Sequence, residues 1–543
     1  MGNVFGLCAK SLRFQTRESR TMQNLLSAGQ TRRRLLGTVG AVSLALALGL
    51  GGVAPSFAAD RAHTIIVGMG GQINTLDPLR ADYNQTNTII SAVYDTLVTY
   101  DETTLVGSLA SEYAYADDAK SIAITLRPDV KFHDGTILTA KDVAYTLDRL
   151  KRLGTGVASL IDGYESTTVS DDAHLTINLS KPNTLFLPSL SKIYIVNSAL
   201  VEANKGADDG QGWLQSHDAG SGPYVLGDQS QAVVIDLFKD YWAPEAGRPE
   251  SIVFRRIDEG ATRVAELRAG NVDVGFSIPD RDAAGMVNDP SLKVVPINTS
   301  YQAEIVFNTQ AGPTADPKVR QALRLIYDYE GGLRGIRGNN GALANGPLPA
   351  RLNCRPDLPV VHRDLDQAKK LLEEAGALDT TFKMNFQPVF ELQKQEATLF
   401  QSNAREIGLN IELEPIAFPN YLASLKDPAT IPSMMLLEDF AQFPDPGIML
   451  VKGYKSDAVG TNRAGYSNPE VDKLLDQAIA TADDAKRCDI YKQVQTILDA
   501  DSVMVDMYGV YKPAVYRVGT LADLKASMLA TPAEPADFRL ANP

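Results

Sequence analysis

Cysteine and histidine are scarce in this sequence. It has three Cys and five His among 543 residues, with no Cys-x-x-Cys spacing and no two His placed to share one helix face. Structural zinc, haem and iron–sulfur sites need arrays of these ligands at short, regular spacings. The sequence therefore predicts no metal and no cofactor.

The motifs of several large enzyme classes are also missing. There is no P-loop and no Gly-x-Ser-x-Gly nucleophile elbow. The run Gly68-Met69-Gly70-Gly71 follows a predicted strand, but the third glycine of a dinucleotide-binding fingerprint is absent. Glu438-Asp439 is an acidic pair that stands out, and its simplest interpretation is a solvated loop edge. We therefore predict that the protein is not an enzyme.

Long hydrophobic runs are absent beyond the N-terminal region. There, Thr31-Arg32-Arg33-Arg34 precedes an apolar, Gly- and Ala-rich run to Gly52, and Ser56-Phe57-Ala58 has the small-x-small pattern of a cleavage site. This order predicts an export signal over residues 1–58 of the twin-arginine type, with the general export route as the alternative. A membrane anchor is disfavoured because the run is shorter than ~20 strongly apolar residues. We expect a cleaved signal and a periplasmic product.

Positive charge is in deficit once the signal is set aside. Residues 1–58 hold seven Lys or Arg and one Glu, so residues 59–543 carry 45 basic and 65 acidic side chains, a net charge of −20. A surface of this sign disfavours nucleic acid and anionic lipid as partners.

Two cysteines, Cys354 and Cys488, remain outside the signal region. An exported protein meets conditions that permit disulfides. Their separation in sequence says nothing about their distance in space, so a disulfide and two inert thiols both remain open.

The region from Gly107 to Arg149 contains the most informative pattern that is present. Ile122–Leu126 alternates as a half-buried strand does, and Asp134-Gly135 predicts a tight turn. Thr139 can cap a helix with Asp142 in its first turn, and its apolar residues recur at helical spacing. Because strands and helices alternate along the chain, the predicted fold class is α/β.

This region resembles the signature of the extracytoplasmic solute-binding proteins, family 5, which includes peptide, nickel and opine binders of ABC importers. The blocks LRPDVKFHDG and LTAKDV carry the likeness almost letter for letter. Further blocks are Leu76-Asp77-Pro78, the run 220–224 (GSGPY) and the run 316–323 (DPKVRQAL). Matches extend from about Ile65 to Tyr508, which is nearly the whole chain after the signal.

The resemblance implies a two-lobed periplasmic binding protein-like fold (type II, cluster C) with an inserted subdomain. Lobe I would comprise residues 59–105, 223–305 and 503–543, and the inserted subdomain residues 106–222. Lobe II would comprise residues 306–502. The chain would pass between the lobes near Tyr301–Ile305 and again near Val503–Tyr508.

The function that the resemblance implies is capture of a peptide-like or other small polar solute for an ABC importer. The partners would then be that solute and the membrane permease subunits, with no cofactor, and the protein would be a monomer. An exported enzyme and a receptor for signalling rather than transport are the alternatives.

The expected ligand site is a cleft between the two lobes. Gly lets backbone approach a ligand, and loops between rigid elements carry function. The loop from Glu438 to Asp445 is expected to form one wall, although its aromatic residues could equally be core. The candidate ligand-binding residues are Gly70, Gly71, Gln72, Asn74, Tyr301, Gln387, Asp439, Phe440, Gln442 and Phe443.

Two of these candidates indicate the class of solute. In dipeptide-binding relatives an Arg and an Asp pair with the two peptide termini, and Gln387 and Gln442 stand at the matching positions. A buried ligand charge without a partner costs several kcal/mol, whereas amides suit hydroxyls and neutral amides. We expect a longer peptide or a neutral polar solute, although Asp439 could still bind an amine.

Overall fold

The computed structural model describes residues 61–81, 83–525, 527 and 533–543. The export signal predicted over residues 1–58 lies outside these residues. Among the described helices none is long and apolar enough to cross a membrane. Helices and strands alternate along the chain, so the predicted α/β class is confirmed.

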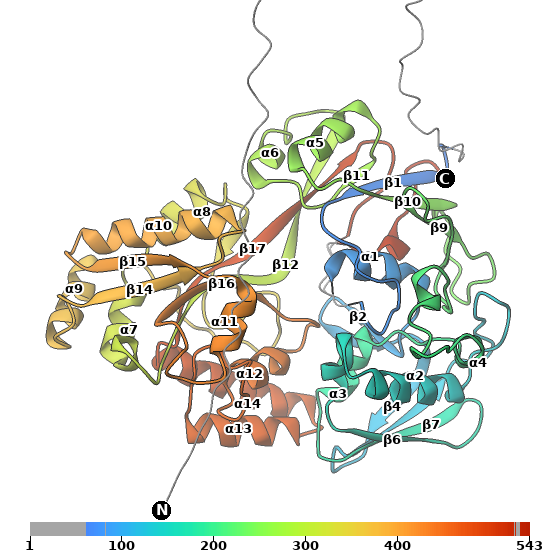
Figure 1. Cartoon of the computed structure of the whole chain (residues 1–543), viewed down its shortest axis with the longest axis horizontal. Coiled ribbons are helices and arrows are strands. Elements are labelled where there is room, and N and C mark those ends of the chain that lie inside the picture. The colour runs from blue at the N-terminus through green and yellow to red at the C-terminus, as the bar shows by residue number, and fades with distance from the viewer. Residues whose placement is uncertain (1–60, 82, 526, 528–532) are drawn as a thin grey trace, which may run out of the picture. The chain divides into compact units, whose positions relative to one another are not determined.

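An eleven-stranded sheet is the main framework (Figure 1). Its strand order is β15-β14-β16-β12-β17-β11-β1-β10-β9-β8, and β13 pairs with β17 outside this path. All six residues of β1 are buried, as expected for a strand covered on both faces. The strands are β1 (Thr64–Met69), β8 (Tyr224–Leu226), β9 (Val233–Leu237), β10 (Ser251–Arg256), β11 (Val274–Gly275), β12 (Leu292–Phe307), β13 (Gly341–Leu343), β14 (Thr381–Phe386), β15 (Asn410–Pro415), β16 (Met434–Phe440) and β17 (Met504–Arg517).

Two long antiparallel strands, β12 and β17, join the lobe I part of this sheet to the lobe II part (Figure 1). Their register shifts between Asn298 and Gln302. The crossings were predicted near Tyr301–Ile305 and Val503–Tyr508, and the two strands extend beyond both segments. The observed strands are longer because each supplies backbone hydrogen-bond partners to the other through stretches with little hydrophobic alternation. The lobe boundaries themselves stay a prediction.

The inserted subdomain contains a separate antiparallel sheet of order β4-β5-β7-β6. Its helix α2 (Ala140–Leu153) begins where predicted, and the Thr139 N–H donates to Asp142 Oδ2 at 2.8 Å. Val143 and Leu147 have no exposed surface, so the predicted helix periodicity is confirmed. The strands here are β4 (Ala110–Tyr115), β5 (Ser121–Leu126), β6 (Tyr164–Val169) and β7 (His174–Leu179), preceded by the hairpin β2 (Val98–Asp101) and β3 (Thr104–Gly107).

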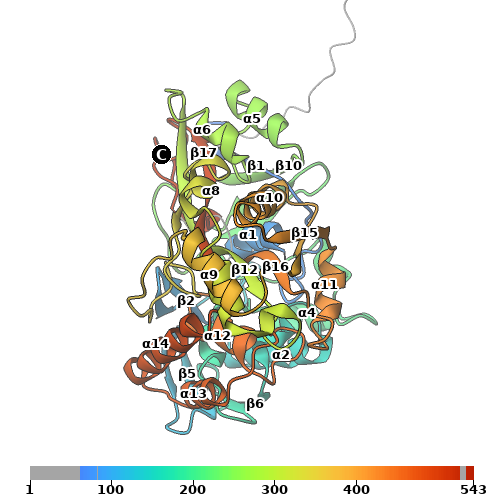
Figure 2. The same ribbon diagram turned by 90° about the vertical axis from the view of Figure 1, so that its left-hand side faces the viewer.

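Helices cover both faces of the sheet in lobe II (Figure 2). Ile305 and Phe307 pack with α7, α9 and α10, whereas Val306 packs with α12, α13 and α14, as alternation along a strand requires. The remaining helices are α1 (Asn84–Val93), α3 (Phe186–Ser189), α4 (Ser198–Ala203), α5 (Gly260–Ala269), α6 (Asp280–Ala284), α7 (Pro317–Arg324), α8 (Tyr329–Gly335), α9 (Leu365–Glu374), α10 (Glu391–Arg405), α11 (Phe418–Ser424), α12 (Pro446–Tyr454), α13 (Pro469–Ile479) and α14 (Asp484–Ala500).

The inserted subdomain packs directly against lobe II. Buried side chains of both, such as Phe186 and Leu475, belong to one hydrophobic cluster. The Thr184 N–H donates to the Ile479 carbonyl at 2.9 Å. Both views accordingly place α13 and α14 beside this subdomain (Figures 1 and 2).

The two cysteines that the sequence left open form a disulfide, Cys354–Cys488, with their Cα atoms 4.9 Å apart. The bond ties the loop before α9 to helix α14, and the Cys354 carbonyl also accepts a hydrogen bond from the Gln495 side chain at 2.8 Å.

Candidate functional site

The Gly-rich corner that follows β1 lies close to neighbouring groups. Gly71 has a φ of +97°, which favours glycine, and its N–H donates to Asp258 Oδ1 at 3.1 Å. A Cβ on Gly70 would lie 2.5 Å from the Arg263 guanidinium. The corner therefore presents mostly backbone to the space beside it.

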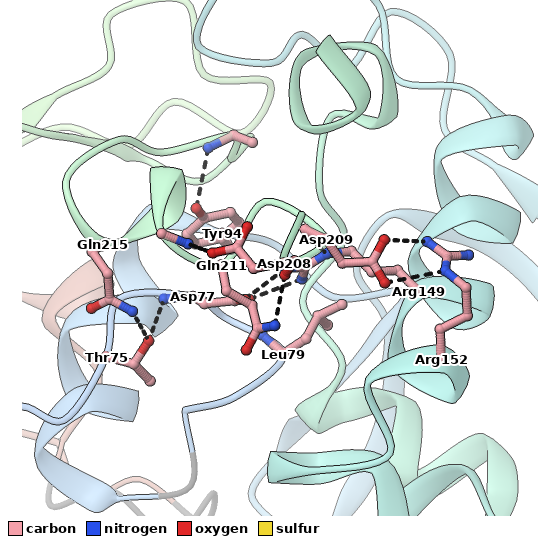
Figure 3. Close-up of polar contacts among 12 residues, drawn as sticks. Thr75, Asp77, Leu79, Tyr94, Arg149, Arg152, Asp208, Asp209, Gln211 and Gln215 are labelled. Carbon is pink, nitrogen blue, oxygen red and sulfur yellow. Dashed lines mark hydrogen bonds and ion pairs between the residues drawn. The ribbon is translucent and has the colours of Figure 1, made fainter. Parts of the chain in front are cut away.

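A fully buried ion pair anchors the segment after this corner (Figure 3). Arg149 of α2 donates to both carboxylate oxygens of Asp77 at 3.0 and 2.6 Å, and neither side chain is exposed. Asp77 Oδ1 also accepts the Leu79 N–H at 3.1 Å. Thr75 Oγ1 accepts the Asp77 N–H and the Gln215 amide at 3.1 and 2.7 Å. The Leu-Asp-Pro block is thus structural and fixes the corner to the inserted subdomain.

A cavity of about 150 Å³ lies beside the corner, and we call it the Tyr301 cavity. Among the described residues that line it, Lys512 carries the only charged side chain, while hydroxyls, amides and backbone supply the other polar atoms. Such a lining suits a small polar solute. The lining residues are Met69, Gly70, Asn84, Gln85, Thr88, Phe276, Ser277, Thr299, Ser300, Tyr301, Lys512, Pro513 and Ser527.

Tyr301 is held from three directions. Its ring stacks on Phe440 with centroids 4.5 Å apart, because the two residues are paired across β12 and β16. Lys512 Nζ lies 3.7 Å from the ring centroid, a cation–π distance. Asn84 of α1 donates its side-chain N–H to the Tyr301 hydroxyl at 2.8 Å. The ring is therefore a fixed wall of the cavity.

A chain of charges extends from this cavity into lobe II. Glu438 accepts hydrogen bonds from Arg337 at 2.7 Å and lies 3.5 Å from Lys512 Nζ. Arg337 also donates to Glu396 at 2.6 Å. Burial acts to raise the pKa of Glu438, but Arg337 and Lys512 outweigh it and hold that pKa below its usual range. Glu438 is therefore ionised and partly neutralises Lys512.

Asp280 of α6 faces the same charges from lobe I. Burial raises the pKa of Asp280 to about 6, with Arg337 and Lys512 acting to lower it and Glu438 to raise it. This carboxyl group therefore changes its charge within a mildly acidic range, next to the network of Glu438 and Arg337.

The interpretation of Glu438-Asp439 as a solvated loop edge is wrong. Glu438, Asp439 and Phe440 are the last residues of β16 and pair with β12. Asp439 forms an ion pair with Arg463 at 2.8 Å. The sequence alone suggested a solvent-facing pair because the basic residues that neutralise these acids, Arg337, Arg463 and Lys512, are distant in the sequence.

The other predicted residues lie in several environments. Gln387 follows β14, is 8% exposed, and donates its backbone N–H to the Gln393 side chain. Gln442 has a buried side-chain oxygen with no hydrogen-bond partner among the described residues. Phe443 is completely buried in the hydrophobic core. Gln72 and Asn74 are exposed in the corner.

The structure thus places Gly70 and Tyr301 at one cavity, with Phe440 stacked on the Tyr301 ring but outside the lining, while their role in binding stays a prediction. This cavity is not lined by the remaining candidates, which are Gly71, Gln72, Asn74, Gln387, Asp439, Gln442 and Phe443. The structure adds Asn84 and Lys512, which the sequence analysis missed. Asn84 opens a helix and Lys512 lies in a strand, and neither position carries a local signal for binding.

The cavity beside the two long strands combines apolar walls with a few polar groups, which is the usual character of a site for a small solute. The chain belongs to the bacterial extracellular solute-binding proteins, family 5, whose Middle region it matches over residues 104–460. This family consists of non-enzymatic binding proteins of ABC transporters that take up peptides or small solutes.

Individual relatives agree with this assignment. The chain is 27% identical to the probable D,D-dipeptide-binding periplasmic protein DdpA of Escherichia coli, over 82% of this chain and 88% of the relative. It is 25% identical to the glutathione-binding protein GsiB of Pectobacterium atrosepticum, over 81% and 87%. The ABC transporter substrate-binding protein CtaP of Listeria monocytogenes has a similar structure, with a TM-score of 0.78, 21% identity, and coverage of 88% and 99%.

Proposed function

We propose that this protein captures its solute at the Tyr301 cavity and delivers it to permease subunits in the membrane. The observation that carries this proposal is the cavity itself, whose walls come from α1, β12 and β17 and whose ring wall is fixed by stacking and a hydrogen bond. Gly70 forms the wall on the corner side, and Gly71, Gln72 and Asn74 would meet the part of the solute that extends past it.

A thermal-shift screen against a solute library tests the proposal. A solute at ~100 times its dissociation constant should add ~2.7 kcal/mol of stability to residues 59–543. Replacing Tyr301→Ala should abolish the shift for that solute while the variant still unfolds cooperatively. A solute that stabilises both proteins equally would place the binding site elsewhere.

The solute is a longer peptide or a neutral polar compound rather than a simple dipeptide held by both termini. Gln387 and Gln442 are neutral at the positions where dipeptide-binding relatives carry charged residues, and neither lines the Tyr301 cavity. Lys512, which does line it, is already countered by Glu438. The relatives reported above are named for D,D-dipeptides and glutathione. Calorimetric titration with dipeptides, tetrapeptides and glycosides decides between these classes. Micromolar binding of a dipeptide, lost when either terminus is blocked, would overturn the proposal.

Lobe I and lobe II close around the solute as a monomer. Among the described strands, only β12 and β17 continue the main sheet from the residues predicted as lobe I to those predicted as lobe II. So narrow a connection favours a hinge at this point. Small-angle scattering should give a smaller radius of gyration with saturating solute. An unchanged radius would argue against closure.

The protein reaches the periplasm through the twin-arginine route, and its signal is removed near Ala58. The basis is the sequence alone, with Arg32 and Arg33 before a weakly apolar run. Replacing both arginines by lysine should leave precursor in the cytoplasm. Unchanged export would assign the protein to the general route instead.

A further inference from the structure

A second, larger cavity lies between the inserted subdomain and lobe II. Its volume is about 520 Å³, and none of its lining residues lines the Tyr301 cavity. Tyr115 lines it from the inserted subdomain and Tyr100 from the neighbouring strand β2, whereas Asp445, Arg487 and Tyr491 come from lobe II. This size lies within the ~300–1,000 Å³ range of small-molecule sites.

Two oxygens at this cavity, Asp445 Oδ2 and the Tyr100 hydroxyl, have no hydrogen-bond partner among the described residues. The Tyr491 hydroxyl also has no partner, but it is fully buried against Gly447 and is not open to the cavity. The other oxygen of Asp445 accepts the Gly447 N–H at 2.7 Å and so caps α12. Because buried polar groups are usually paired, this set points to a ligand that supplies hydrogen-bond donors.

The charges at the cavity favour a ligand of positive charge. Arg487 donates to Asp484 at 2.6 Å and to the Thr481 and Ala482 carbonyls, so these hydrogen bonds are taken, although its charge also acts on Asp445 from beyond ion-pair distance. Asp445 has no ion-pair partner in the described part of the chain and is 8% exposed. Burial raises the pKa of Asp445, against the lowering influence of Arg487 and of the Gly447 N–H. A bound cation would compensate this carboxylate.

Tyrosine rings complete this arrangement. Tyr113 lines the cavity together with Tyr100, Tyr115 and Tyr491. Tyr115 and Tyr113 are already held by hydrogen bonds to backbone carbonyls, at 3.0 and 2.9 Å, so their rings are fixed. Fixed aromatic rings attract cations and give flat apolar contact to the body of a ligand.

We propose that this cavity binds a small solute with a protonated amine and an apolar or aromatic body, its ammonium group donating to Asp445 and to the Tyr100 hydroxyl. The site is separate from the Tyr301 cavity and does not depend on the function proposed there. Since its walls come from lobe II, from the inserted subdomain and from the hairpin of β2 and β3, an occupant stabilises the contact of lobe II with the other two.

Three isosteric probes test the charge preference by calorimetric titration of the chain 59–543. Benzylamine carries the cation, benzyl alcohol is neutral, and benzoate is the anion. We expect benzylamine to bind at least about tenfold more tightly than benzyl alcohol and benzoate, a difference of about 1.4 kcal/mol. Equal binding of all three, tighter binding of benzoate, or no binding of benzylamine would overturn the proposal.

The variant Asp445→Asn tests the residue without breaking the helix, because Asn caps helices as well as Asp does. It should lose the preference for benzylamine. The matched control is Asp316→Asn, since Asp316 also precedes a proline and caps its helix by accepting the N–H two residues on. The control should bind benzylamine as the unchanged protein does. Retained preference in Asp445→Asn would exclude this carboxylate as the ammonium partner.

Discussion

The two sides of the Tyr301 cavity are built by different means. On the Gly70 side the wall is backbone, and the segment that follows is anchored by the buried ion pair of Asp77 and Arg149. On the Tyr301 side the wall is an aromatic ring, stacked on Phe440 and flanked by Lys512. The first side holds its shape through a contact that never reaches the cavity, whereas two of the groups that hold Tyr301 on the second side, Asn84 and Lys512, line the cavity themselves.

This difference separates stability from binding. A change at the anchor of the first side should unfold the protein without touching a ligand. A change at the stacked rings should alter the ligand surface and leave the core intact. The predictions below test that separation, beginning with the largest effect.

Removing the buried anchor should cost the most stability. Asp77→Ala leaves the Arg149 charge buried and unpaired, so the free energy of unfolding should fall by about 3–5 kcal/mol. Urea denaturation followed by circular dichroism measures the loss. The control Asp240→Ala removes an exposed partner of Lys131 and should cost no more than about 1 kcal/mol. Equal losses in the two variants would contradict the structural role of Asp77.

The disulfide provides a covalent anchor within lobe II. Replacing Cys354 and Cys488 by serine should lower the free energy of unfolding by about 2–4 kcal/mol, because the unfolded chain gains freedom over a separation of 134 residues. Denaturation with and without reductant measures this loss. Reductant should lower the free energy of unfolding of the unchanged protein and leave that of the double variant as it was. A reductant effect of equal size on the double variant would show that the bond is not responsible.

Truncating the stacked ring should mainly affect binding. Phe440→Ala removes the ring that supports Tyr301, so solute affinity should fall, whereas the lost aromatic pair should lower the free energy of unfolding by only about 0.5–1.5 kcal/mol and change the melting temperature little. The comparison variant Phe443→Ala empties a fully buried position and should lose about 3–5 kcal/mol of stability. If Phe440→Ala instead unfolds easily and binds normally, Phe440 is core.

The smallest expected effect is a pH dependence from Asp280. Its pKa in the folded protein is raised to about 6, above the value of the unfolded chain, so folding binds a proton between those values. The resulting stability is complete below about pH 4 and is lost as pH rises through 6. In Asp280→Asn the free energy of unfolding should change by about 1 kcal/mol less over this pH range. The expected difference is small because the Asp280 side chain is only partly buried. A slope unchanged in the variant would assign the effect to other carboxyl groups.

Much of the fold could be predicted from local patterns. The helix after Thr139 begins at its capping box, and the strand before the Asp134-Gly135 turn was expected from its alternation. These elements follow from hydrogen bonds and apolar periodicity within a few residues of sequence. The order of these elements in the complete α/β architecture was predicted from the resemblance to the family.

The candidate site could be predicted only in part. Gly70 and Tyr301 were found because corners and aromatic residues at a strand crossing are recognisable in sequence. Lys512 and Asn84 were missed, and Glu438-Asp439 was misread as a loop edge. Their roles depend on strand pairing across β12, β16 and β17, which brings together residues far apart in the chain.

The sequence by itself determined the family, the α/β class and the absence of recognisable metal-binding spacings, because each depends on local composition and pattern. Only the tertiary structure decided that Cys354 and Cys488 are bonded and that a buried ion pair anchors the corner. It also decided that the Tyr301 cavity and the cavity at Asp445 share no lining residue. The physical reason is that covalent bonds, ion pairs and cavities depend on distances between remote segments, and those distances arise only when the hydrophobic core packs.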